Sequence, residues 1–189
     1  NFIWPAAREW ATAEALLPLV LERGYQGCPD MTELSKKLAR LYGAALSVDG
    51  TMSGQSRVLT VSLSGIRDAF ALAGEPLSRE YADIAFGTAF EPYRVDGVLD
   101  AEAVAIEKEQ LRELLEGEIN EKRSYCIRQA RRRFYGDSPA GIERNGYLDE
   151  VDGLTADAVT RAYARMVEQA QIEVFVLGAD VDAVAQRLR

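Results

Sequence analysis

The sequence contains no histidine among its 189 residues. Ser-His-Asp and Cys-His catalytic systems are excluded within the chain, because the imidazole that accepts the proton is missing. Zinc sites built on imidazole are excluded as well, and two cysteines far apart in the sequence, Cys28 and Cys126, do not replace them. Acid–base catalysis by Asp, Glu, Lys or Tyr and carboxylate sites for magnesium or calcium remain open.

Targeting and nucleotide-binding signals are also missing. No apolar run reaches the roughly 18 residues that would span a bilayer, and no secretory signal pattern opens the sequence. Glycine-rich phosphate-binding motifs and the G-x-S-x-G motif are absent. Two cysteines do not form a disulfide framework, so we expect a reduced, cytoplasmic protein without membrane contact. The first residues, Asn1-Phe2-Ile3-Trp4, resemble the inside of a strand and suggest a fragment of a longer chain.

The composition is that of a globular, acidic protein. Apolar residues make up 48% of the chain and charged residues 28%, which is typical of a domain with a proper core. The formal net charge is -8 and the pI is near 4.8. Because such a surface repels phosphate backbones, nucleic-acid binding is disfavoured.

Hydrophobic periodicity predicts helices in blocks between strands. Apolar residues at helical spacing predict the following helices: 12–23, with Pro18 inside it; about 30–43; 78–90; one long helix over about 100–134; one from Thr155; and one over 181–189. A weaker pattern predicts a helix over 66–73. Alternating apolar residues predict strands over 44–48 and 57–64, and a glycine-rich turn over 50–54. Residues 2–6 are expected as an edge strand and 172–177 as a central one. This order favours an α+β fold of two layers.

Four segments follow a recognisable order. Residues 13–24 read Ala-Glu-Ala-Leu-Leu-Pro-Leu-Val-Leu-Glu-Arg-Gly, residues 41–46 place a Tyr-Gly step before a strand, residues 106–110 form a Glu-Lys-Glu run, and residues 134–141 read Phe-Tyr-Gly-Asp-Ser-Pro-Ala-Gly. In this order they resemble the insulinase, pitrilysin and mitochondrial processing peptidase family. The resemblance implies a metallohydrolase fold of the processing-peptidase type, with a mixed, mainly antiparallel sheet backed by helices. It also implies one peptidase-like domain over residues 1–189, half of a longer two-domain chain.

The resemblance places the family's metal site on residues that cannot bind metal. In the H-x-x-E-H motif two imidazoles four residues apart reach one zinc ion, and a glutamate acts as general base. The first histidine falls on Ala15, the glutamate on Pro18 and the second histidine on Leu19. The third ligand, a glutamate in active relatives, falls on Leu115 or on Glu116. No catalytic residue, metal or cofactor is therefore expected, and the pattern is most similar to the family's non-catalytic bacterial members.

Several functional readings remain open at this stage. The leading hypothesis is a non-catalytic homologue that scaffolds an active peptidase relative, or pairs with a second homologous domain to hold a peptide. The alternatives are an enzyme of another class that uses carboxylates or a divalent ion, a peptidase active only within a hetero-complex, and an unrelated α+β interaction domain. The strand over 44–48 is a candidate edge for peptide addition. Arginines on the long helix form a candidate patch for an acidic partner, although a solvated helix end explains them equally well: Arg128, Arg131, Arg132 and Arg133.

Overall fold

The computed structural model of this chain describes residues 1–188 and is organised on a four-stranded antiparallel sheet. The strand order is β2-β3-β1-β6, with the bounds Phe2–Pro5 for β1, Ala45–Ser53 for β2, Ser56–Ser64 for β3 and Gln171–Ile172 for β6. A second, two-stranded sheet is a small hairpin of β4 (Arg94–Val95) and β5 (Val98–Leu99). The predicted α+β fold with a mainly antiparallel sheet is confirmed.

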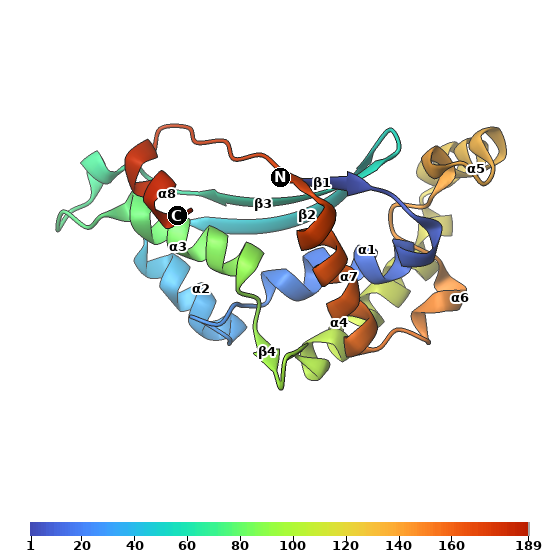
Figure 1. Cartoon of the computed structure of the whole chain (residues 1–189), viewed down its shortest axis with the longest axis horizontal. Coiled ribbons are helices and arrows are strands. Elements are labelled where there is room, and N and C mark those ends of the chain that lie inside the picture. The colour runs from blue at the N-terminus through green and yellow to red at the C-terminus, as the bar shows by residue number, and fades with distance from the viewer. Residues whose placement is uncertain (189) are drawn as a thin grey trace.

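Most of the helices lie on one side of the sheet, and α5 projects at one end of the molecule (Figure 1). The helices are α1 (Ala11–Glu22), α2 (Met31–Arg40), α3 (Leu77–Phe90), α4 (Ala101–Gly117), α5 (Lys122–Tyr135), α6 (Leu148–Val151), α7 (Ala156–Gln169) and α8 (Val181–Arg187). None of the helices within residues 1–188 has the length and apolarity needed to cross a bilayer.

Side-chain caps fix where several helices begin. Asp30 accepts hydrogen bonds from the backbone N–H groups of Thr32 and Glu33 at the start of α2. Asp100 does the same at the start of α4, and Thr155 caps α7. Each cap satisfies amide donors that have no partner inside the helix, which is why these boundaries are readable from the sequence.

The main core lies between α1 and the sheet. Leu16, Leu17 and Leu21 of α1 are fully buried and belong to the same cluster as Trp4 of β1 and Met166 of α7. The apolar spacing that predicted a helix over 12–23 therefore corresponds to its buried face. Burying a side chain of this size contributes about 1.5–3 kcal/mol, so α1 is held mainly by packing.

The predicted long helix is wrong as a single element. Helix α4 ends at Gly117, a 3-10 turn spans Glu118–Asn120, and α5 starts at Lys122. Glycine is a poor helix former, and Glu121 leaves the helical conformation with φ -86° and ψ 72°.

Some strand and turn predictions are also corrected. Of the predicted central strand over 172–177, only Ile172 is in a strand, and β6 lies at the sheet edge beside β1. Strand β1 is not an edge strand, because it pairs with β3 on one side and β6 on the other. Gly50 lies within β2, and the hairpin turn falls at residues 54–55. The weak helix over 66–73 is a 3-10 turn, Asp68–Phe70. The prediction for Arg189 lies outside the described residues.

Candidate functional site

Helix α1 carries the positions that the resemblance assigns to metal binding, and Pro18 lies in its interior. A proline at this position cannot donate the backbone hydrogen bond to the Glu14 carbonyl. The buried Pro18 ring faces β2 at Gly50, where an added Cβ would lie 3.0 Å from the proline Cγ. Glycine in the strand thus permits the helix to approach the sheet this closely.

Ala15 and Leu19 lie on α1 as partly buried residues packed against the main core. Leu115, from the neighbouring helix α4, packs against the same core cluster. Glu116, the other position considered for a third ligand, is exposed. The geometry therefore groups Ala15, Leu19 and Leu115 on one apolar cluster and leaves Glu116 outside it.

The side chains at these positions can pack against the core but cannot bind a metal ion. A methyl and two isobutyl groups offer no lone pair to a metal, and proline offers no carboxylate to act as a base. Within residues 1–188, no group of three or more Cys, Asp or Glu side chains is arranged to hold a metal ion.

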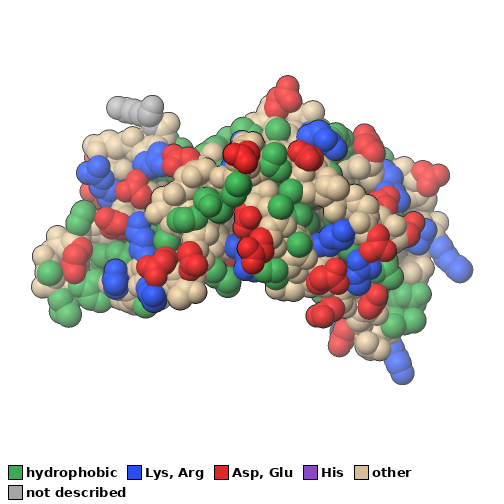
Figure 2. Space-filling view, turned by 90° about the horizontal axis from the view of Figure 1, so that it is seen from below, with side chains coloured by type: hydrophobic (Ala, Val, Ile, Leu, Met, Phe, Trp, Pro, Cys, Tyr) green, Lys and Arg blue, Asp and Glu red, His purple; other side chains and the backbone are tan. Residues whose placement is uncertain are grey.

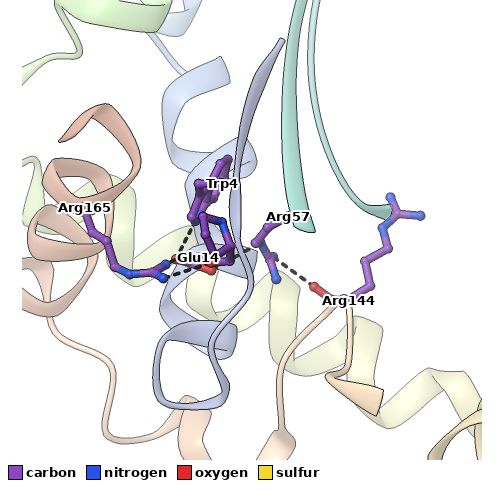
Figure 3. Close-up of polar contacts among 6 residues, drawn as sticks. Trp4, Glu14, Arg57, Arg144 and Arg165 are labelled. Carbon is purple, nitrogen blue, oxygen red and sulfur yellow. Dashed lines mark hydrogen bonds and ion pairs between the residues drawn. The ribbon is translucent and has the colours of Figure 1, made fainter. Parts of the chain in front are cut away.

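A buried ionic cluster is centred on Glu14, the residue that precedes Ala15 (Figure 3). Glu14 is 1% exposed, and its Oε1 accepts a hydrogen bond of 2.8 Å from Trp4 Nε1 and another from Arg165 Nη1. On the other side, Arg57 Nε of β3 lies 3.8 Å from Glu14 Oε2. Sequence reasoning missed this cluster, although one glutamate within the apolar stretch 11–21 was a signal that could have indicated it.

Two guanidinium groups share this single carboxylate. Arg57 Nη2 also donates to the Arg144 carbonyl at 2.9 Å, and Arg165 Nη2 donates to the Pro5 carbonyl at 2.9 Å. Burial lowers the pKa of Arg57 to about 10, while the nearby Glu14 carboxylate opposes this shift, so the guanidinium remains charged at neutral pH. The cluster therefore ties α1 to β1, β3 and α7 through the buried Glu14 and Arg57 and the partly buried Arg165.

The four arginines predicted as a patch do not form one uniform surface. Arg128 is paired with Glu118, lies 3.9 Å from Glu143 and stacks over the Tyr125 ring. Burial raises the pKa of Glu143, against the lowering effect of Arg128. Part of this positive charge is thus neutralised within the molecule.

The remaining arginines of α5 are exposed. Arg131 and Arg132 line a groove of about 590 Å³ between α5 and residues 140–149, and Arg131 donates a hydrogen bond of 3.4 Å to the Ala140 carbonyl. Arg133 does not line this groove. Elsewhere, the face seen in Figure 2 carries acidic and basic side chains side by side instead of a field of one sign.

The edge of the sheet next to α1 is β2. Its register runs from the Ala45–Ser64 pair to the Ser53–Ser56 pair, all with β3. Within the described residues no strand pairs with the other side of β2. The segment predicted as an edge for peptide addition, 44–48, thus lies mostly within an edge strand.

Known proteins share this sequence pattern and this fold. The chain is 27% identical over 179 residues to a Bacillus subtilis protein named "Probable inactive metalloprotease YmfF", which covers 95% of this chain and 42% of the relative. The predicted family resemblance is confirmed. The chain also has the fold of a conserved protein from Enterococcus faecalis, with a TM-score of 0.90 and 24% identity over 99% of this chain and 44% of the other.

A more distant structure shares this fold. It is described as a peptidase M16 inactive domain from Pseudomonas fluorescens, and it superposes with a TM-score of 0.63 and 16% identity over 86% of this chain and 36% of the other. No protein-family model matches the chain. The chain spans less than half the length of these relatives.

Proposed function

We propose that this M16-like chain performs no peptide hydrolysis and forms one wall of a peptide-holding chamber together with a partner. The observation that supports the proposal concerns the positions that the resemblance assigns to the metal site: Ala15 and Leu19 pack against the core, and Pro18, which offers no carboxylate, lies inside α1. Without two imidazoles and a carboxylate, neither zinc nor an activated water is held at α1.

The unpaired side of β2 supports a role in peptide holding. A peptide that adds to this edge gains backbone hydrogen bonds and needs no special side chains on the domain. Helix α1 packs behind this strand through the Pro18–Gly50 contact, so the edge is backed by a rigid element. A chain that has lost the metal site thus retains a surface that recognises extended peptides.

The comparisons support a partnership. The Bacillus and Pseudomonas relatives carry the word inactive in their names. This chain spans 42% of the length of the first and 36% of the length of the second. We propose that the partner is a second homologous domain of a longer chain, or an active peptidase relative with an intact H-x-x-E-H motif. The exposed arginines Arg131, Arg132 and Arg133 are proposed to meet an acidic surface of that partner. A reducing, cytoplasmic setting suits the free thiols of Cys28 and Cys126.

Zinc binding tests the proposal that the chain has no metal site and performs no peptide hydrolysis. Equilibrium dialysis of the chain against zinc is expected to give much less than one equivalent per chain. The matched positive control is the triple variant Ala15→His, Leu19→His, Leu115→Glu, which rebuilds three ligands on the shared apolar cluster and is expected to bind zinc. One tight equivalent of zinc on the unmodified chain would overturn the proposal.

Reconstitution tests the partnership. The chain is co-expressed with an active relative from its own host, and the complex is isolated by size exclusion. Peptide hydrolysis by the complex is expected to exceed that of the relative alone, and to fall when Arg131, Arg132 and Arg133 are replaced by Gln. A complex whose activity is independent of this chain contradicts the chamber role.

A further inference from the structure

The chain reverses direction after α5 and forms a groove against this helix. Gly136 ends α5 with a φ of 56°, a left-handed conformation that glycine adopts at little cost. Gly141 follows in such close contact that an added Cβ would clash with the Gly136 carbonyl oxygen. These two glycines let residues 140–149 run beside α5, and the groove of about 590 Å³ lies between the two segments.

The wall of the groove formed by residues 144–147 is fixed from behind. Arg57 donates a hydrogen bond of 2.9 Å to the Arg144 carbonyl, and the Tyr147 N–H donates one of 3.1 Å to Thr12 Oγ1. In Figure 3 the Arg144 guanidinium points away from the buried ionic cluster. The backbone of this wall is therefore held by α1 and β3, while the exposed Arg144 side chain lines the groove.

Basic side chains outnumber acidic ones along the groove. Arg8 is paired with Glu150, and Arg128 is paired with both Glu118 and Glu143, so these two arginines are neutralised within the chain. The charged residues that line the groove are Arg8, Arg128, Arg131, Arg132 and Arg144 on the basic side, and Glu118, Glu143 and Asp149 on the acidic side.

The other arginines of the groove have a charge that the chain itself does not neutralise. Within residues 1–188, no carboxylate forms an ion pair with Arg131, Arg132 or Arg144. Among the lining carboxylates, Asp149 alone offsets them without an ion pair of its own in the same part of the chain. The whole chain has a formal net charge of -8, so this local excess of positive charge favours an anionic ligand.

Apolar side chains line the groove as well. Ile127 is 52% and Leu148 42% exposed, and Leu115 and Ile142 line the same groove. A small anion would pair with the arginines but would leave this apolar surface in contact with water. A polypeptide segment that carries both acidic and apolar side chains satisfies both parts of the groove.

We propose that the partner binds in this groove through an acidic segment of its own chain, whose carboxylates pair with Arg131, Arg132 and Arg144 and whose apolar side chains pack on the apolar lining. This inference rests on the proposed function, which supplies the partner. It places the contact at the junction of α5 with residues 140–149, so that Arg144 belongs to the site and Arg133, which does not line the groove, contributes little.

An acidic probe peptide tests the groove. Acetyl-Glu-Leu-Glu-Glu-Leu-Glu-amide is titrated into the chain at low ionic strength and followed by NMR, which gives both the affinity and the residues that respond. Chemical shifts are expected to change along the groove, at residues 124–132 and 140–149. Acetyl-Gln-Leu-Gln-Gln-Leu-Gln-amide is the uncharged control and is expected to bind at least about tenfold more weakly.

Arginine variants locate the contact. Arg144→Gln is expected to weaken binding of the acidic probe about fivefold, and the combined change of Arg131, Arg132 and Arg144 to Gln to abolish it. Arg133→Gln also removes one exposed arginine, and it is the matched control because its expected effect is less than about twofold. Thermal denaturation shows that each variant is folded.

Several results would overturn this assignment. Absence of binding up to millimolar probe, or equal binding of the uncharged peptide, means that the groove does not select acidic segments. Equal losses in Arg133→Gln and Arg144→Gln mean that a diffuse field attracts the probe. Full displacement of the probe by equimolar inorganic phosphate means that the site takes a small anion. Shift changes along the groove that grow with protein concentration, without any peptide, mean that a second copy occupies it.

The complex with the active relative separates this inference from the proposed function. Stimulation of peptide hydrolysis that falls with Arg144→Gln but not with Arg133→Gln supports the groove as the contact. Stimulation that Arg144→Gln leaves unchanged refutes the groove, while the proposed function stands. Absence of any stimulation by the unmodified chain refutes the proposed function, whatever the probe peptide does.

Discussion

At the scale of single residues, Glu14 is a fully buried carboxylate that faces two guanidinium groups. Its two neighbours, Arg57 and Arg165, bring two positive charges to one negative charge. Replacing a buried charge pair by well-packed apolar groups often leaves the free energy of unfolding unchanged. Removing one partner lowers it, because the other charge stays buried without compensation. The cluster is therefore sensitive to single substitutions at Glu14 in particular.

We expect Glu14→Gln to lower the free energy of unfolding by roughly 3–5 kcal/mol, because it leaves the buried Arg57 and the partly buried Arg165 without a counter-charge. Urea denaturation at neutral pH measures this change. Glu113→Gln, on the exposed face of α4, is the matched control and is expected to stay within about 0.5 kcal/mol. Similar stability of the two variants contradicts the assigned role of Glu14.

At the scale of elements, the contact between α1 and β2 depends on a proline and a glycine together. Glycine in a strand normally costs stability relative to alanine. Here an added Cβ would lie 3.0 Å from the ring of Pro18, which has little freedom to move inside a helix.

We therefore expect Gly50→Ala to destabilise the chain by about 1–3 kcal/mol through overpacking. In a Pro18→Ala background the same substitution is expected to be neutral or stabilising, because the opposing ring atoms are gone. A double-mutant cycle by urea denaturation measures the coupling between the two positions. Additive effects of the two substitutions would show that the contact is not the reason for the glycine.

Sequence reasoning located elements well where the signal is local. The caps Asp30 and Asp100 and the apolar stripe of α1 act within one or two turns of a helix, and these boundaries agree with the structure within about two residues. The break after Gly117 was missed because the amphipathic pattern continues across it. Residues 172–177 have strand composition, but a strand also needs a partner, and pairing depends on residues distant in sequence.

At the scale of the whole molecule, the order of segments predicted the fold although no single segment did so. The α+β arrangement with a mainly antiparallel sheet is confirmed, as is the similarity to M16-like proteins. The assignment of Ala15, Pro18, Leu19 and Glu116 as remnants of a metal site stays a prediction. The buried cluster around Glu14 was not predictable, because its members come from four elements that periodicity cannot bring together.

The pairing of Asn1 with Glu173 also has a consequence for how the chain folds. This contact joins residues 172 positions apart, and it completes the side of β1 that β3 does not cover. Contacts of such long range slow folding, because a large loop must close before the contact forms. During synthesis, β1 acquires its second neighbour only after β6, at Gln171–Ile172, has been made. Until then one edge of an apolar strand stays open, so the sheet is expected to be completed late relative to the synthesis of β1.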